Sequence, residues 1–247
     1  MKIKHFIFST VWILAGIFIC GCIVIDLNGC SGQRVRGSGN VISESRQVPE
    51  FREIRLEGRG KVALTQGNRS SIEVTTDDNI LPSIETVVKN GKLILSHEKG
   101  KNLRPTTLNF TITVKDLEGI SIAGSGDIIG NEGFNSERLY TDIAGSGDIA
   151  IKVSADLLES SISGSGSISL SGSANSYDAR ITGSGDIDAF KLQARDSSVV
   201  ITGSGNCRIR VSDKLRAKIT GSGDVLYIGH PQISKSITGS GKVKDRN

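Results

Sequence analysis

Aromatic residues are scarce in this sequence of 247 residues, in which Phe, Trp and Tyr together make up 4%. Large rings supply much of the core of a compact globule, so their shortage favours a thin structure with a core of Ile, Val and Leu. Proline is also rare at 4 residues, whereas glycine reaches 30. The 30 basic and 26 acidic residues nearly balance, and no long run of one sign occurs. Binding of nucleic acid requires a concentrated basic stripe, so no nucleic-acid partner is expected.

Residues 1–30 have a composition unlike that of the rest of the chain. Residues 1–5 form a short basic start, and an apolar run without any charge follows over residues 6–25. This pattern is typical of a signal peptide. The run also has about the ~20 residues that a membrane-spanning helix needs, so a retained membrane anchor is an alternative.

Three of the four cysteines lie in or just after this segment, and Cys30 is the first candidate for lipidation. Residues 27–30, Leu-Asn-Gly-Cys, resemble a bacterial lipobox, in which a small residue precedes the cysteine that carries the lipid. Cys22 is the alternative, because a shorter and more typical apolar run precedes it. We therefore expect a lipoprotein signal over residues 1–30, a lipid bilayer as partner, and a short tether over residues 31–40. An uncleaved anchor ranks second and soluble secretion third.

Gly-Ser-Gly triplets dominate the second half of the chain, and internal repeats reveal an architecture before any other signal. Isoleucine stands two positions before each triplet, and a small or hydroxyl residue stands between them. An apolar residue follows each triplet by two positions. Two further copies occur upstream, at Gly37 and at Gly58. The first glycines of the seven triplets are Gly124, Gly145, Gly164, Gly183, Gly203, Gly221 and Gly239, spaced by 18 to 21 residues.

Within each unit, apolar and polar residues alternate with a period of two, which is typical of strands. An unchanging unit of this length, without a helical pattern, favours an all-β fold, a right-handed parallel β-helix over residues 41–247. We expect ten or more turns. A β-sandwich is the alternative, although it gives no reason for a constant unit. Residues 63–119 lack the triplet and form either degenerate coils or an inserted β/α element, with a short helix over residues 79–88.

The repeated Ile-Thr-Gly-Ser-Gly-Asp-Ile units resemble a known family, as do residues 51–58 (Phe-Arg-Glu-Ile-Arg-Leu-Glu-Gly) and residues 90–95 (Asn-Gly-Lys-Leu-Ile-Leu). They are similar to the putative auto-transporter adhesin, head GIN domain family. The resemblance extends from about Val41 to Val243. It implies a β-helical protein of the bacterial cell envelope, commonly exported and often lipid-anchored, without catalytic residues that could be transferred to this chain.

An acidic column follows the triplets, at Asp127, Asp148, Asp186 and Asp224. Calcium needs six to eight converging oxygens, so these are weak calcium candidates, and hydrogen bonds to local turns are the better expectation. Cys207 occupies a position that is apolar in the other units, which predicts a buried and inert thiol. No catalytic motif or metal-ligand spacing occurs among the histidines, so we expect no enzyme, no metal and no cofactor.

Three hypotheses of function remain from the sequence. The first is a non-catalytic interaction module of the envelope, an adhesin that contacts glycan or a surface protein and sits at the outer membrane, in the periplasm or on the cell surface. The second is a purely structural envelope protein, and the third is a β-helical carbohydrate-active enzyme. Residues 208–218 are locally basic and could contact anionic glycan or lipid headgroups, although a solvated face is the simpler expectation. A monomer is expected.

Overall fold

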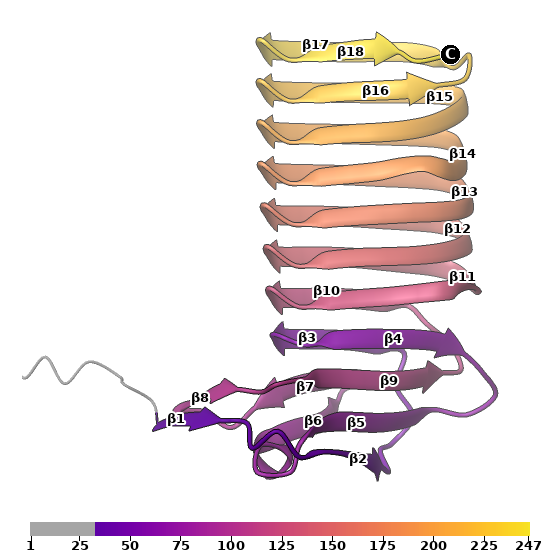
Figure 1. Ribbon diagram of the computed structural model, residues 1–247. Helices are drawn as coiled ribbons and strands as arrows, with labels where there is room; N and C mark the ends of the chain where they lie inside the picture. The colour runs from indigo at the N-terminus through magenta and orange to yellow at the C-terminus, as the bar shows by residue number, and fades with distance from the viewer. Residues whose placement is uncertain (1–32) are drawn as a thin grey trace, which may run out of the picture. The chain divides into compact units, whose positions relative to one another are not determined.

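A stack of parallel coils forms the second half of the protein, whose computed structural model describes residues 33–247 (Figure 1). Each coil hydrogen-bonds in parallel to the next, so the strands follow one another in chain order across the sheet. About seven turns result. The strands of the stack are β10 (Gly119–Gly124), β11 (Asp127–Gly145), β12 (Asp148–Gly164), β13 (Ser167–Gly183), β14 (Asp186–Gly203), β15 (Asn206–Gly221), β16 (Asp224–Ile228), β17 (Gln232–Gly239) and β18 (Lys242–Asp245).

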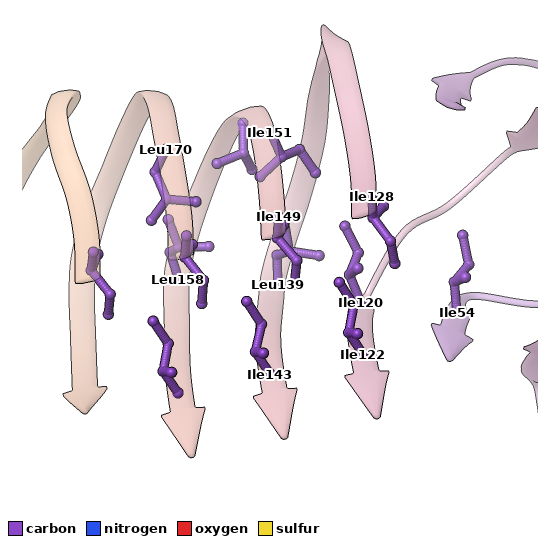
Figure 2. Packing of buried hydrophobic residues seen from close by; sticks show 14 of the residues in the cluster. Ile54, Ile120, Ile122, Ile128, Leu139, Ile143, Ile149, Ile151, Leu158 and Leu170 are labelled. Atoms are coloured by element: carbon purple, nitrogen blue, oxygen red, sulfur yellow. The ribbon is translucent and has the colours of Figure 1, made fainter. Parts of the chain in front are cut away.

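Equivalent residues of successive units lie one above the other, as the repeat predicts. Ile143 pairs with Ile162, and Gly145 pairs with Gly164, in the parallel register of β11 and β12. The isoleucines before the triplets are buried from Ile122 to Ile219, and Figure 2 shows how such apolar side chains stack between neighbouring coils. The core is therefore a set of continuous apolar columns, and the predicted parallel β-helix is confirmed. The β-sandwich alternative is wrong, because the coils pair in parallel with the next repeat.

The triplet marks a sharp corner of each coil, and Gly164 shows why glycine is required there. Its φ of +136° lies in a region that residues with a Cβ rarely adopt. A Cβ on Gly164 would also overlap the carbonyl oxygen of Gly145 in the coil below. That oxygen accepts a hydrogen bond of 2.9 Å from the backbone N–H of Ser165. Close stacking of the corners thus depends on the missing side chain.

The first part of the structure combines coil-like strands with antiparallel pairs. Its strands are β1 (Gln33–Arg36), β2 (Val41–Arg46), β3 (Glu53–Gly58), β4 (Lys61–Gln66), β5 (Ser71–Asp77), β6 (Ile84–Lys89), β7 (Lys92–His97), β8 (Lys101–Arg104) and β9 (Leu108–Val114). β3 and β4 continue the stack, since Leu56 pairs with Ile122 and Gly58 with Gly124. The copy of the repeat at Gly58 is therefore in register.

The copy at Gly37 does not form a coil, and there the prediction from the repeat is wrong. The strand that follows it, β2, pairs antiparallel with β5. Its triplet is instead held by acidic and amide side chains: the N–H of Gly39 donates to Asp77 at 2.8 Å, and the N–H of Ser38 donates to Asn79 at 3.0 Å. Residues 33–40, expected as a tether, thus consist of strand β1 and a hydrogen-bonded loop.

Residues 63–119 mix both types of pairing. β5 pairs antiparallel with β9, and β6 pairs antiparallel with β7, whereas β9 pairs in parallel with β4 and β7 with β3. The short helix expected over residues 79–88 is reduced to a 3-10 helix, η1 (Leu81–Ser83), because strand β6 begins at Ile84. This departure from regular coils also explains why the stack has about seven turns and not the expected ten or more. None of the helices among the described residues has the length and hydropathy of a membrane-spanning helix.

Candidate interaction surfaces

The acidic column predicted from the triplets lies on one edge of the coil stack, where each carboxylate follows a corner. Asp127 and Asp148 lie on adjacent coils, while Ser167 separates Asp148 from Asp186. Asn206 in turn separates Asp186 from Asp224, which lies opposite Lys242. The structure therefore brings two of the four candidates side by side and keeps the other two apart.

Three of these carboxylates accept hydrogen bonds from the coil above. The backbone N–H groups of Ser167, Asn206 and Lys242 donate to Asp148, Asp186 and Asp224 at 3.2, 2.9 and 2.9 Å. Hydrogen bonding and charge from Lys244 also lower the pKa of Asp224. Across residues 33–247, no three His, Cys, Asp or Glu side chains are grouped so that they could hold a metal ion. The geometry assigns these oxygens to coil-to-coil hydrogen bonds of the kind that Asp commonly makes in turns.

A more convergent polar cluster lies where β3 and β7 meet the first complete coil. Lys92 of β7 forms an ion pair of 2.8 Å with Glu53 of β3, and the hydroxyl of Tyr140 donates to the same carboxylate oxygen. Gly119 lies between Glu53 and Tyr140 in the strand register, and a Cβ there would overlap the Tyr140 ring. The missing side chain lets the tyrosine lie across β10 and reach a strand two positions away.

The environment of this cluster favours the charged forms of Glu53 and Lys92 and the neutral form of Tyr140. Burial opposes ionisation of Glu53, but hydrogen bonds from Lys92 and Tyr140 outweigh it and lower the pKa of the carboxyl. Its hydrogen bond with Glu53 raises the pKa of Lys92. Burial, together with the neighbouring carboxylate, raises the pKa of Tyr140 to about 12. General acid–base catalysis works best with a pKa near the working pH, and all three shifts lead away from neutrality.

A groove runs from this cluster along the same face of the coils. Arg55 and Lys92 line its lower end, Glu159 and Asp178 its middle, and Arg180 its upper end. Such a mixture of unlike charges is the feature that would favour an enzyme among the β-helix proteins. Here the charged side chains come from successive coils and are spread along the groove. The groove is basic at its two ends and acidic in its middle.

A second shallow groove crosses four coils, and its lining combines neutral polar groups with the charged side chains of Glu137, Asp156 and Arg195. Asn135, Ser154, Ser173 and Gln193 form its wall in consecutive coils. Alanines at the neighbouring inward positions, such as Ala174, leave the wall shallow because they add little bulk. Amide and hydroxyl groups can donate and accept hydrogen bonds, which is the chemistry needed to contact sugar hydroxyls.

Of the four cysteines, the structure describes Cys207. Cys207 is fully buried, and it is unpaired among the described residues. The predicted burial of Cys207 is thus confirmed. Burial also raises the pKa of its thiol to about 12. Cys30 and Cys22, the candidates for lipidation, lie outside the described residues.

Comparison with known proteins identifies the family. A family model described as "Putative auto-transporter adhesin, head GIN domain" matches residues 50–231, which is more than half of the chain. The chain belongs to this family. The expected resemblance is thereby confirmed, and the matched residues extend from the β3 segment through nearly the whole coil stack. No curated protein matches the sequence.

Solved structures from Bacteroides and Parabacteroides share this fold. A putative adhesin from Bacteroides fragilis is 28% identical, with a TM-score of 0.82; the match covers 86% of this chain and 100% of that one. A putative lipid binding protein from Parabacteroides distasonis is 29% identical, with a TM-score of 0.75, covering 87% and 100% of the two chains. A putative adhesin from the same species is 27% identical, with a TM-score of 0.73 and the same coverage.

The Glu53–Lys92–Tyr140 cluster in this head GIN domain was not found from the sequence, although one signal for it exists there. The outward position held by Tyr140 is occupied by Glu159, Asp178 and Ser198 in the next three coils. Tyr140 is thus a large aromatic side chain in a column that is small or acidic over the next three coils. Glu53 and Lys92 carry no such signal, because their strands reach the cluster through pairing that is distant in the sequence.

Proposed function

We propose that this protein is a non-catalytic interaction module of the bacterial cell envelope, which presents the polar faces of its coil stack to a glycan or a surface protein. One observation carries this proposal: outward residues of one chemical type recur in register over successive coils, as in Thr182, Thr202 and Thr220. A periodic surface of this kind suits a partner that is itself extended or repetitive, because many weak contacts add through multivalency. Membership of an adhesin family supports the same conclusion.

The directions of the pKa shifts support the non-catalytic part of the proposal. In the most convergent cluster, Glu53 is held ionised and Tyr140 is held protonated near neutral pH. Neither group is therefore poised to exchange a proton, as general acid–base catalysis requires. Cys207, the thiol of the coil stack, is buried away from any substrate.

The proposal includes a lipid on Cys30, with Cys22 as the alternative. The described residues begin with β1 at Gln33, so a lipid on Cys30 would leave a linker on the order of 10 Å at most between the lipidated residue and the first strand. A linker of this length would keep the module close to its membrane. Cys22 would lengthen the linker by eight residues.

Two experiments on cells test these statements separately. Metabolic labelling with a palmitate analogue should mark the wild-type protein, and Cys30→Ala should abolish the label while Cys22→Ala preserves it. The opposite pattern would move the lipid to Cys22, and an unlabelled wild-type protein would favour a retained membrane anchor. Protease added to intact cells, with permeabilised cells as control, should degrade a surface module, whereas protection until permeabilisation would contradict adhesion and favour a structural role in the periplasm.

A further inference from the structure

Basic and acidic residues are nearly equal in number over the whole sequence, but they are unevenly distributed along the coil stack. Residues 119–205, which form the first complete coils, contain 11 acidic and 5 basic residues. Residues 206–247, which form the last coils, contain 3 acidic and 9 basic residues. Because the coils are stacked in chain order (Figure 1), this change along the sequence becomes a change in space. The upper coils therefore carry a positive field beside negative lower ones.

Three of the basic residues gather on one sheet face, which we name the cation face: Arg180, Arg216 and Lys218. Arg180 lies on β13, and Lys218 lies two coils further in the same outward column. Arg216 lies beside Lys218 on β15, one outward position earlier on the strand. All three side chains are exposed, and none of them forms an ion pair within residues 33–247.

The coil between these cations carries small side chains on this face. Ser198 and Val200 of β14 lie directly between the residues of β13 and those of β15 in the register. Since coils are about 4.8 Å apart, Arg180 and Lys218 are separated by about 10 Å across a shallow step. Thr202 and Thr220 form an exposed hydroxyl column beside it. The cations and the hydroxyl column thus lie side by side on this face.

Other charges border the cation face. Asp178 lies on the same strand as Arg180, and Asp196 lies opposite Lys214 between β14 and β15. Lys214 adds a further cation at the edge. Lys235 of β17 pairs with the buried Ala217, so it continues an inward column at the end of the stack and does not belong to this face. The acidic residues mark the lower and lateral limits of the cation face, and its upper part has an excess of positive charge.

We propose that the cation face binds an acidic polysaccharide, that is, a linear glycan carrying carboxylate or sulfate groups. Unpaired cations attract the anionic groups, and the adjacent threonines can exchange hydrogen bonds with sugar hydroxyls. The regular spacing of the coils matches a polymer with a repeating unit better than a folded protein surface. A lipid surface is disfavoured because interfacial binding draws much of its strength from apolar side chains buried in the bilayer, and Val200 of this face is half-buried. The exposed Ile233 and Ile237 pair with the buried Leu215 and Ile219, so they continue inward columns at the end of the stack and lie off this face. The inference rests on the proposed function and names the class of partner.

Binding of defined polymers tests this inference with the full chain, purified in a neutral detergent. Polygalacturonate and dextran sulfate supply the carboxylate and the sulfate, and uncharged dextran is the control polymer. The triple variant Arg180→Gln/Arg216→Gln/Lys218→Gln should bind at least tenfold more weakly than wild type at low salt. The matched control Arg69→Gln/Lys89→Gln/Lys99→Gln removes three exposed cations from the first part of the structure and should stay within about twofold of wild type.

A gain-of-affinity variant keeps the test independent of folding defects. Val200→Lys places a cation between Arg180 and Lys218 in the same column, so affinity for both acidic polymers should rise severalfold. Added salt should weaken wild-type binding, because exposed charges are screened.

Several outcomes would overturn the inference. Wild-type protein that binds neither acidic polymer excludes it, as does an equal loss of binding in the two triple variants. Preferential binding to phosphatidylglycerol vesicles, lost in the cation-face variant, would assign the face to a membrane. Failure here leaves the proposed function intact if protease still reaches the protein on intact cells. Protection in that cell assay, with polymer binding retained in vitro, would instead contradict adhesion and leave the assignment of the cation face intact.

Discussion

Two physical effects require glycine at the corner position of Gly164, and Gly164→Ala should destabilise the protein through both of them. The first is conformation: Gly164 has a φ of +136°, and placing a Cβ residue in a left-handed region costs roughly 1–2 kcal/mol. The second is contact: the added Cβ would overlap the carbonyl oxygen of Gly145, and such overpacking costs about 1–3 kcal/mol. Gly164→Ala should therefore lower the free energy of unfolding by about 2–5 kcal/mol.

Two matched glycines isolate the two contributions. Gly100 has a φ of +82° with no atom within 4 Å of an added Cβ, so Gly100→Ala should cost only the conformational part, about 1 kcal/mol. Gly166 lacks a left-handed φ, but its Cβ would overlap the carbonyl oxygen of Gly147 and lie 2.9 Å from Ile143 Cγ2. Gly166→Ala should thus cost about 1–3 kcal/mol from contact alone.

Urea unfolding of the full chain, followed by circular dichroism, measures these differences as shifts of the midpoint at constant slope. If both contributions act at the corner, Gly164→Ala is the most destabilising of the three substitutions, and its loss of stability approaches the sum of the other two. A Gly164→Ala protein as stable as the wild type would show that the corners can separate without cost. That result would refute the claim that stacked glycines determine the spacing of the coils.

Asp77, Cys207 and Gly119 each allow a separate test of the contacts described above. Asp77→Asn should destabilise the protein by about 2–4 kcal/mol, because hydrogen bonds to a buried carboxylate are among the stronger ones. Burial disfavours ionisation of Asp77, but hydrogen bonds from Thr106 outweigh this effect and lower the pKa of the carboxyl. The ionised carboxylate therefore contributes its full stabilisation above the ordinary Asp pKa of about 3.9. This contribution is lost as the pH falls through the lower pKa of Asp77 in the folded protein. Urea midpoints measured from about pH 6 down to about pH 2 should fall less steeply for Asp77→Asn than for wild type. Cys207, with its pKa raised to about 12 by burial, should react with iodoacetamide at least about 100-fold more slowly in folded than in urea-unfolded protein, measured by peptide mass spectrometry. Gly119→Ala should displace the Tyr140 ring and cost about as much as Tyr140→Phe, roughly 1.5–3 kcal/mol, and the two losses should not add in the double variant.

The sequence predicts the coil stack well because each coil repeats one local solution. Three positions of each unit determine which side chains point inward: the isoleucine before the triplet, the glycine at the corner and the apolar residue after it. The slot taken by Cys207 is an example, since its burial follows from register alone. Because each residue stacks on the equivalent residue of the next unit, contacts between coils can be predicted from the repeat alone.

Apart from the copy of the repeat at Gly58, residues 33–118 could not be predicted in this way, because their pairing depends on contacts that have no local signature. The triplet at Gly37 matches the repeat in sequence, yet β2 pairs antiparallel with β5 and the triplet is bound by Asp77 and its neighbours. The copy at Gly58 reads Gly-Arg-Gly and so departs further from the repeat, yet it does join the stack. The Glu53–Lys92–Tyr140 cluster depends on the same distant pairing.

The division between inward and outward positions bears directly on function. Inward positions are constrained by the apolar columns, so they repeat from coil to coil. An outward position such as that of Ser161, Arg180, Val200 and Lys218 changes its chemistry at each coil while its place in the fold stays fixed. The stack therefore holds any outward set of side chains at a regular spacing without altering the core. Recognition by such a protein depends on where the outward columns depart from uniformity, and the cation face is one such basic departure on the coils that the structure describes.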